Sequence, residues 1–392
     1  MKKFLNSFCA VFVLTACLFV GCKAPSSGGG SSSGNNGGTV ASNGITINGI
    51  LLENTAEVYV TGPNVATITG KTNSDNYAGV FIQGRTVTLS PFIMGKYEVT
   101  QELYTAVMTN QTVSVKGQTK TLESAPFYCR ADSNDYKVLL SGEEQKYRAA
   151  EGMTWFDAVY FCNRLSELTG LTPAYEITLV GSYSDMAYDG VDNDNNGLTD
   201  FDDPYEREGS VVSGHIIGAF VNIVQDANGY RLPTEAEWEF AARGGDPTKS
   251  AWDYTFSGAP KANGSNYTAS KNAGLDTVGW YLYNTTSGST GNSGPSSGGA
   301  GWGTHQVGKK NANALGIFDM SGNVWEWCYD WSDTILTGSE TDPVGTASGS
   351  YRVSRGGSWY SDACYCAVSN RSYRHPSNRA DDLGFRVVRN AN

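Results

Sequence analysis

The chain has 392 residues, a formal net charge of −11 at pH 7 and only 17% charged residues. This acidic balance argues against nucleic acid and anionic membrane as general partners. The eight cysteines are too few and too scattered for a disulfide framework, so a packed core must hold the fold. We expect a monomer with one large or two modest domains.

The first 21 residues are typical of a signal peptide. Lys2 and Lys3 precede the apolar run FCAVFVLTACLFV, which ends in LFVGC, the pattern of a bacterial lipoprotein cleavage site. We therefore expect a lipid on Cys22, with an uncleaved membrane helix as the alternative. No later segment reaches the ~20 apolar residues that spanning a bilayer requires. The mature protein is expected to be exported and attached to the bacterial membrane by this lipid alone, at the outer membrane or cell surface.

A Gly/Ser-rich linker over residues 22–44 follows, and its composition is typical of a flexible tether. Residues 45–84 alternate apolar and polar side chains between turn residues, which predicts short β-strands. The sequence leaves open whether the earlier of these strands form a separate element. We expect the main domain over residues 85–392.

Capping residues predict three helices in the main domain. Thr100 is a candidate N-cap for the segment VTQELYTAVM. In MTWFDAVYFCNRLSELTG, Thr154 and Asp157 have the spacing of a capping box, which satisfies the unpaired N-terminal amides of a helix. Thr234 and Glu237 repeat this arrangement in RLPTEAEWEFAARGG. No helix longer than a turn or two is expected after that segment.

An Asp-rich insertion over residues 185–205 contains the segment YDGVDNDNNGLTDFDDPY. Its oxygen-bearing residues have the spacing of an EF-hand-type loop, and Gly197 would allow the sharp turn that such a loop needs. No amphipathic helix clearly flanks it, so we expect an isolated calcium loop, with a solvated acidic loop as the alternative. The expected ligands are Asp192, Asp194, Asn196, Asp200 and Asp203.

Five motifs occur in order along the chain: FIMGKYEVTQELYTAVM, EGMTWFDAVYFCNRLSELTGL, GYRLPTEAEWEFAARGG, NALGIFDMSGNVWEWCYDW and RVSRGGSW…LGFRVV. Together they resemble the formylglycine-generating (sulfatase-modifying) domain, over roughly residues 85–390. The resemblance implies an α+β protein with the C-type lectin fold of the formylglycine-generating type. Such a fold has two main helices, β-hairpins and much irregular loop.

The segment DMSGNVWEW resembles the calcium-binding turn of this family. The resemblance implies a structural calcium ion held by side-chain oxygens of Asp319 and Glu326 and by backbone oxygens of Gly322 and Val324. Two carboxylates around a Gly-Asn turn are suitable donors for a hard cation. The alternative is a Trp-rich core turn in which Glu326 pairs with an arginine.

The enzymes of this family hold copper between two thiolates, and the resemblance places these at Ser361 and Cys366. A neutral hydroxyl cannot replace a thiolate as a ligand for soft Cu(I). Cys364 could substitute only if its segment were extended, because residues two apart then share a face. We therefore expect neither copper nor catalytic residues. If the protein were a copper-dependent cysteine oxidase, Cys366 and Cys364 would carry the chemistry.

Residues 360–382 resemble the variable region of proteins diversified by retroelements, which use the same lectin-type fold. There, Asn codons are randomised at their first two bases and cannot become Lys, Glu, Gln, Met or Trp. None of these five occurs from Tyr360 to Leu383. By average composition this would happen by chance on the order of a few per cent of the time. The alternative is an ordinary lectin face without diversification.

We therefore predict a surface lipoprotein that binds an extracellular protein or glycan through residues 360–382. Tyr, Ser, Asn, Asp and Arg are typical of adaptable binding surfaces. Arg371 and Arg379 are expected to support this region from below through bidentate hydrogen bonds. A structural envelope lipoprotein without a ligand is the other alternative. The expected ligand-binding residues are Trp359, Tyr360, Ser361, Asp362, Cys364, Tyr365, Ser372, Tyr373, Arg374, His375, Ser377, Asn378, Ala380, Asp381 and Asp382.

Overall fold

The computed structural model describes residues 39–60, 68–70, 79–133, 136, 138–180, 211–259, 271–286 and 299–391. In this part of the chain, no helix has the length and apolarity needed to cross a bilayer. Several expected features lie outside the described residues. They are the signal peptide, Cys22, most of the linker, and the Asp-rich loop with Asp192, Asp194, Asn196, Asp200 and Asp203.

The helices begin at the predicted caps. They are α1 (Gln101–Met108), α2 (Trp155–Leu168), α3 (Glu235–Ala242) and α4 (Leu275–Val278), with 3-10 turns η1 (Gln145–Tyr147), η4 (Ser250–Asp253) and η5 (Ala363–Cys366). Thr100 caps α1. Both capping boxes are complete, with Thr154 and Asp157 at the start of α2 and Thr234 and Glu237 at the start of α3. The three predicted helices are thus confirmed, because local sequence alone satisfies their first amides.

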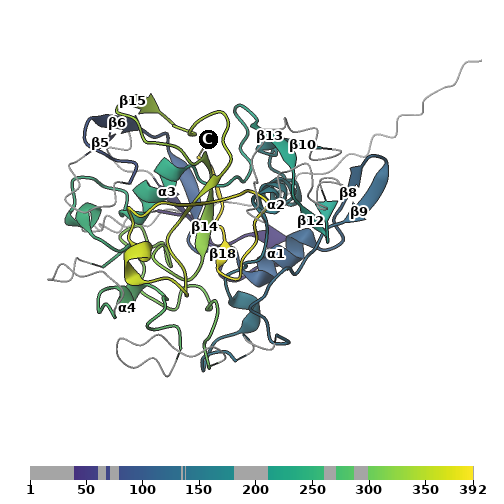
Figure 1. Cartoon of the computed structure of the whole chain (residues 1–392), viewed down its shortest axis with the longest axis horizontal. Helices are drawn as coiled ribbons and strands as arrows, with labels where there is room; N and C mark the ends of the chain where they lie inside the picture. Colours follow the sequence, from purple (N-terminus) through teal and green to yellow (C-terminus); the bar gives the residue numbers. More distant parts are fainter. Residues whose placement is uncertain are drawn as a thin grey trace, which may run out of the picture. The chain divides into compact units, whose positions relative to one another are not determined.

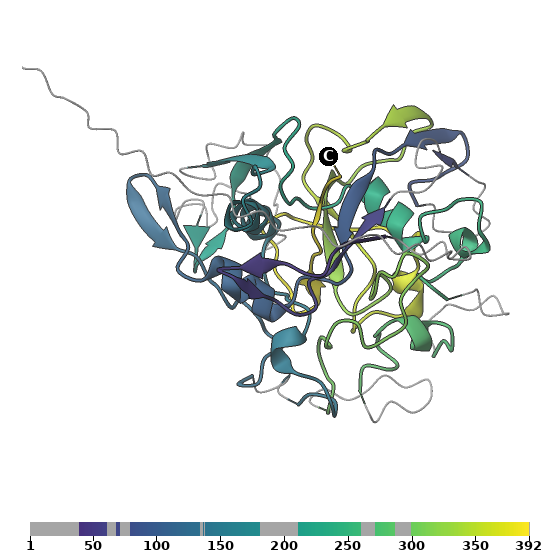
Figure 2. The same cartoon turned by 180° about the vertical axis from the view of Figure 1, so that it is seen from behind.

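The described strands form two four-stranded sheets, a three-stranded sheet and four two-stranded sheets (Figures 1 and 2). The first four-stranded sheet has the order β1 (Thr39–Ser42), β4 (Glu57–Val60), β7 (Phe92–Gly95), β19 (Val388–Asn390). The second has the order β17 (Ser372–Arg374), β16 (Arg352–Arg355), β14 (Trp325–Trp331), β18 (Leu383–Gly384). The smaller sheets pair β15 (Gly338–Thr341), β6 (Arg85–Thr88) and β5 (Ile68–Thr69); β2 (Thr46–Ile47) and β3 (Ile50–Leu51); β8 (Thr112–Val115) and β9 (Gln118–Thr121); β10 (Tyr175–Leu179) and β13 (Ala219–Ile223); and β11 (Val211–Val212) and β12 (His215–Ile216).

The early strands belong to the main fold. β4 pairs antiparallel with β7, with Val58 opposite Met94, and both side chains are fully buried. Val58 and Val60 of β4 lie in one hydrophobic cluster with Phe92 and Met94 of β7. The alternating apolar side chains of this early strand therefore complete a core of the main fold.

Two hydrophobic cores support the two sides of the fold. In the first, Tyr104 of α1 stacks on Phe161 of α2 with ring centroids 5.4 Å apart, and Phe385 packs edge-on against Phe161. In the second, the indole of Trp238 on α3 is fully buried against the sheets. The predicted α+β class follows from this mixture of helices and short strands around shared cores.

Candidate binding face

The start and the end of the expected binding region lie on either side of one strand. β14 pairs antiparallel with β16 and parallel with β18, so that Glu326 lies opposite both Arg355 and Gly384. Figure 1 shows β14 and β18 side by side at the centre of the molecule. Because β16 precedes residues 360–382 and β18 follows them, both ends of the region are fixed within one buried sheet.

The backbone within the region is also held by neighbouring segments. The amide of Val368 donates to the carbonyl of Thr255 at 2.9 Å, and the carbonyl of Pro376 accepts from the N-terminus of α2 at 2.9 Å. Further along, the amide of Gly152 donates to the carbonyl of Ala380 at 3.1 Å. The carbonyl of Asp382 accepts from β14 at 2.8 Å. These bonds fix the path of the chain without using any side chain of the region.

Arg355 is the main buried support of the face. Its side chain has no exposed surface, forms an ion pair with the buried carboxylate of Glu239, and donates to the carbonyls of Asn370 and Val368. The guanidinium also lies 5.1 Å from the ring of Trp238. A charge this deeply buried is tolerated only when ion pairing and hydrogen bonds replace its water shell.

The two arginines expected beneath the face behave differently. Arg371 makes the expected bidentate contact, with nitrogen–oxygen distances of 2.6 and 2.8 Å to Glu235. Arg379 makes no such contact, which corrects the expectation. It instead lies 2.8 Å from Nε2 of His215, whose Nδ1 is 2.7 Å from the carboxylate of Asp157. Because arginine can only donate, Nε2 of His215 is the acceptor in this contact, and Nδ1 faces the carboxylate.

This chain of contacts gives a prediction for His215. In a His215→Phe variant, Arg379 and Asp157 each lose a hydrogen-bond partner, at a cost of about 1–3 kcal/mol. We expect faster hydrogen exchange in residues 376–382, measured by mass spectrometry. Because the Arg379 side chain is largely exposed, Arg379→Ala should raise exchange in the same segment with little loss of global stability. Unchanged exchange in both variants would contradict this role for His215.

Three tyrosines dominate the exposed surface of the face. Tyr360, Tyr365 and Tyr373 are 57%, 46% and 59% exposed. Trp359 and His375 are instead buried, so they support the surface rather than extend it, which differs from expectation. Of the other expected residues, Ser361 is buried and Asn378 is exposed. The remaining ones are partly buried: Asp362, Cys364, Ser372, Arg374, Ser377, Ala380, Asp381 and Asp382.

At one end, Tyr360 belongs to an aromatic cluster that includes residues far away in sequence. Its ring centroid lies 5.3 Å from that of Trp359 and 5.6 Å from that of Trp302. Tyr136 packs edge-on against Trp359 at 6.0 Å and its hydroxyl donates to the carboxylate of Asp381. Sequence analysis missed Trp302 and Tyr136, because no local pattern connects them to residue 360.

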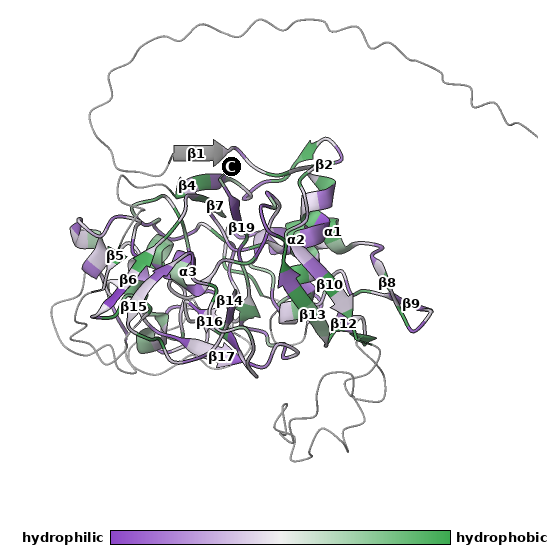
Figure 3. Ribbon diagram, turned by 90° about the horizontal axis from the view of Figure 1, so that it is seen from above, coloured by the Kyte–Doolittle hydropathy of each residue, from purple (hydrophilic) through white to green (hydrophobic). Residues whose placement is uncertain are grey.

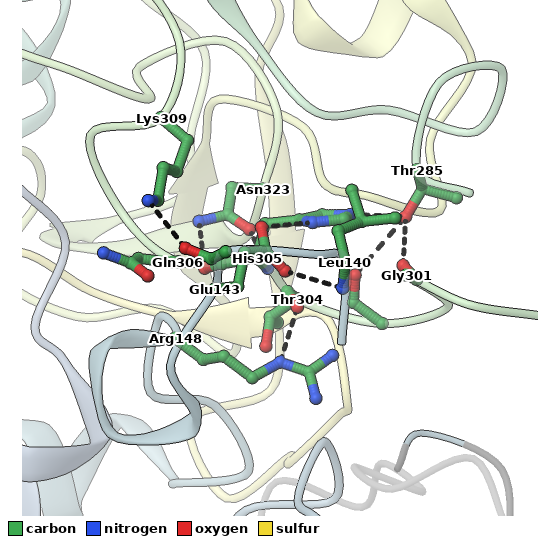
Figure 4. Close-up of polar contacts among 12 residues, drawn as sticks. Leu140, Glu143, Arg148, Thr285, Gly301, Thr304, His305, Gln306, Lys309 and Asn323 are labelled. Carbon is green, nitrogen blue, oxygen red and sulfur yellow. Dashed lines mark hydrogen bonds and ion pairs between the residues drawn. The ribbon is translucent and has the colours of Figure 1, made fainter. Parts of the chain in front are cut away.

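A buried polar network holds the loop that carries Trp302 (Figure 4). The ring of His305 lies 3.0 Å from both Glu143 and Thr285, and its backbone amide donates to Asn323 at 2.8 Å. Arg148 donates to the carbonyl of Thr304 at 2.6 Å. Burial lowers the pKa of His305, which disfavours the charged form of the ring. The network therefore fixes the position of Trp302.

At the other end, Tyr351 extends the face beyond its expected limits. Its ring centroid lies 5.3 Å from that of Tyr373 and 6.4 Å from that of His375. Tyr351 is 37% exposed and precedes β16, whose pairing with β17 brings it to this position. This contact could not be predicted from local patterns, because it depends on the register of two strands.

The positions that correspond to the copper ligands of the family are Ser361 and Cys366. The hydroxyl of Ser361 lies 2.9 Å from the hydroxyl of Ser358, and Cys366 is fully buried beneath Gly357. Burial raises the pKa of the Cys366 thiol far above its usual value, which disfavours the thiolate that a metal needs. Cys364 and Cys366 lie on the 3-10 turn η5 rather than on an extended strand. They therefore do not share one face as the Cys-x-Cys alternative required.

The expected calcium turn forms the arginine pairing of its core-turn alternative. Glu326 pairs bidentately with Arg386 at 2.7 Å and accepts from Trp238, as the core-turn alternative proposed. Asp319, however, has one carboxylate oxygen that is buried without a hydrogen-bond partner. Glu98 lies close by, and burial together with Asp319 and Glu326 raises its pKa well above the usual range. Burial beside these carboxylates disfavours the charged form of Glu98, and a cation bound here would favour it.

Glu151 lies beneath the last part of the face and gives a prediction about pH. Its carboxyl group accepts from the amides of Tyr128 and Cys129, and burial raises its pKa to about 8. Between about pH 4.5 and pH 8, the unfolded chain loses this proton while the folded protein keeps it. Folding stability should therefore fall as the pH rises through this window. Urea unfolding at pH 5 and pH 8 measures the fall, and Glu151→Gln should make it smaller.

Comparisons with known proteins agree with this architecture. A family model described as "Sulfatase-modifying factor enzyme 1-like domain" matches residues 52–391. "Chaperone protein LppX" of Paenibacillus barcinonensis is 30% identical over 327 residues, which cover 81% of this chain and 85% of that protein. The solved structure "Treponema denticola variable protein 1" is 31% identical with a TM-score of 0.56, over 88% of this chain and 98% of that one.

Formylglycine-generating enzymes match a shorter part of the chain. The enzyme of Streptomyces coelicolor is 36% identical over 173 residues, which cover 42% of this chain and 48% of the enzyme. This match thus spans about half the length of that relative. The family match and the variable-protein structure together confirm the predicted fold class.

Proposed function

Because the chain belongs to the sulfatase-modifying factor enzyme 1-like family, we propose that it uses this scaffold for binding rather than for catalysis. It is an exported lipoprotein, attached through Cys22, that binds an extracellular protein or glycan through residues 360–382. The similarity to a protein named as variable supports a diversified face. The similarity to LppX extends over most of both chains and is consistent with a family member that is not an oxidase.

The observation that carries this proposal is the contrast between the face and its support. Tyr360, Tyr365 and Tyr373 expose large amphipathic side chains, while Arg355 and the surrounding backbone are fully buried. Tyrosine provides a large contact area at a low cost in side-chain entropy, which suits a surface that must bind. A rigid frame with exposed tyrosines lowers the entropy lost on association.

Binding screens with matched variants test the proposal. The purified domain is applied to a glycan array and to arrayed extracellular proteins, and each hit is repeated with a Tyr360→Ala/Tyr373→Ala variant. Loss of the hits in this variant, with retention in Phe220→Ala, supports the face, since Phe220 is 50% exposed on β13, a strand outside residues 360–382. Ligands that still bind both variants would contradict binding through the proposed face. The ligand is a glycan if the hits that depend on the two tyrosines come from the glycan array. It is a protein if they come from the protein array.

Two further observations separate the alternatives. Copper-dependent oxidation of a Cys-x-Pro-x-Arg peptide by the purified protein would overturn the binding proposal in favour of the oxidase. A reverse transcriptase gene beside this gene, with an Asn-codon-rich near-copy of the sequence for the last part of the chain, would support diversification. If both are absent from the genome, diversification fails and binding stands on the screens alone.

We also propose that Asp319, with the carbonyls of Gly322 and Val324 and with Glu326, holds a structural calcium ion, and that Asp192, Asp194, Asn196, Asp200 and Asp203 hold a second. A bound cation at the first site would neutralise part of the buried negative charge around Asp319. It would also satisfy the carboxylate oxygen that has no hydrogen-bond partner.

Removal of calcium should lower the melting temperature of the protein. Saturation at about 100 times the dissociation constant stabilises the folded state by about 2.7 kcal/mol. Differential scanning calorimetry in EDTA and in excess calcium measures the change. Asp319→Asn should reduce the calcium response, whereas Asp330→Asn, at a buried carboxyl group outside the site, should not. If the melting temperature of the wild-type protein were the same in EDTA and in excess calcium, both proposed calcium sites would be contradicted.

A further inference from the structure

The hairpin of β2 and β3 exposes aliphatic side chains where a soluble surface would favour polar ones. Asn48 and Gly49 form its turn, with φ of 52° and 79°, in the left-handed region that Asn and Gly tolerate. Directly after this turn, Ile50 and Leu51 are 65% and 56% exposed. Ile47, on the other strand, is buried in the first core, so the hairpin is anchored and its tip is presented outward.

The hairpin lies next to the point where the tether joins the fold. β1 begins at Thr39 and β2 begins at Thr46, so only a few residues separate the end of the tether from the hairpin. Sixteen residues, 23–38, lie between Cys22 and β1. A Gly/Ser-rich chain of this length has a root-mean-square span of roughly 20–24 Å. A lipid on Cys22 would therefore keep the hairpin close to the bilayer surface.

The strand at one end of the binding face, β17, lies on the other side of the fold. Figure 3 shows β1, β4 and β2 along one side of the molecule and β17 along the opposite side. The edge strand β17 carries Tyr373, one of the exposed tyrosines of the face. A domain that rests on the bilayer through its β2–β3 hairpin would thus direct the face away from the membrane.

We infer that Ile50 and Leu51 contact the lipid bilayer and set the orientation of the domain, an inference that rests on the proposed lipid anchor at Cys22. Two aliphatic side chains bury too little apolar area to recruit a free protein to a membrane. Attached to an anchored chain, however, they act at a high effective concentration, because the tether confines them near the surface. The contact is therefore an orienting one, and the anchor provides the affinity.

Photo-crosslinking of the full-length lipidated protein tests this contact. A benzophenone amino acid is placed at position 50 or, as the control, at position 336, and the protein is reconstituted in phosphatidylcholine vesicles that contain a clickable lipid. Leu336 is 71% exposed and lies two residues before β15, a strand that Figure 3 shows away from β1. We expect at least about fivefold more lipid adduct at position 50 than at position 336. Leu51→Asp should reduce the adduct at position 50 while the protein stays on the vesicles.

Two failures of this experiment can be told apart. Mass spectrometry of the same sample shows whether Cys22 carries a lipid, and density-gradient flotation shows whether the protein stays with the vesicles. If it does both and positions 50 and 336 give equal adducts, the hairpin contact is refuted while the anchor stands. If Cys22 carries no lipid, the anchor in the proposed function is refuted, and the orientation inferred from it falls with it.

Discussion

An Arg355→Met variant is expected to lose about 3–5 kcal/mol of folding stability, the usual cost of breaking a buried ion pair by removing one partner. The loss arises because Glu239 keeps a buried charge with one cation fewer, and because the carbonyls of Asn370 and Val368 lose their donor. Urea unfolding followed by tryptophan fluorescence measures the change. Hydrogen exchange in residues 366–371 should rise in the same variant.

Arg243→Met is the matched control for this prediction. Arg243 also pairs with Glu239, at 2.8 Å, but it is partly exposed and its other hydrogen bond goes to the carbonyl of Trp252. We expect a smaller loss of stability and unchanged exchange in residues 366–371. If both variants lost equal stability, or if exchange in the face did not respond to Arg355→Met, Arg355 would not be the specific support of the binding region.

Single substitutions of Tyr360 and Tyr373 should each weaken ligand binding at least about tenfold, or ~1.4 kcal/mol, while the stability of the domain stays the same. Both rings are more than half exposed, so their removal leaves no cavity in the folded protein. Surface plasmon resonance with a ligand recovered from the screens measures affinity, and calorimetry of the same samples measures stability. We expect the affinity for the ligand to fall while the stability of the domain stays unchanged.

Tyr351→Ala and Phe220→Ala define the limits of the face. Tyr351 packs against Tyr373, so its removal should also weaken binding, by less than the loss of Tyr373 itself. Phe220 is 50% exposed on β13 and should have no effect. If substitution of Tyr360, Tyr373 and Tyr351 each left the affinity for the ligand unchanged, the binding site would lie elsewhere on the protein. That result would refute the proposed face.

The local sequence predicted the features that depend on neighbouring residues. The caps at Thr154 and Thr234 could be found because a helix N-terminus is satisfied by a side chain three residues away. The support by Arg371 followed from the resemblance to a known fold together with the preference of arginine for bidentate partners. These interactions need no knowledge of how distant segments meet.

Features that join distant segments were missed or only partly predicted. The partner of Arg379 is His215, which lies 164 residues earlier, and no spacing rule connects the two. Trp302 reaches Tyr360 through a loop fixed by buried hydrogen bonds, which composition does not reveal. The pairing of Glu326 with Arg386 was considered only as an alternative to calcium binding. In each case the missing information was the tertiary arrangement.

The backbone bonds along residues 360–382 limit the kind of variation that this region can accept. The chain is fixed at Val368, Pro376, Ala380 and Asp382 by segments outside the region. An inserted or deleted residue would shift every later contact out of register, whereas a substitution between these points would leave all of them intact. Unlike antibody loops, which also differ in length, such a surface would change its chemistry on a constant backbone shape. Variants of this surface would then differ in the chemical groups that they recognise on a ligand, while the shape of the backbone that presents the contact residues stays the same.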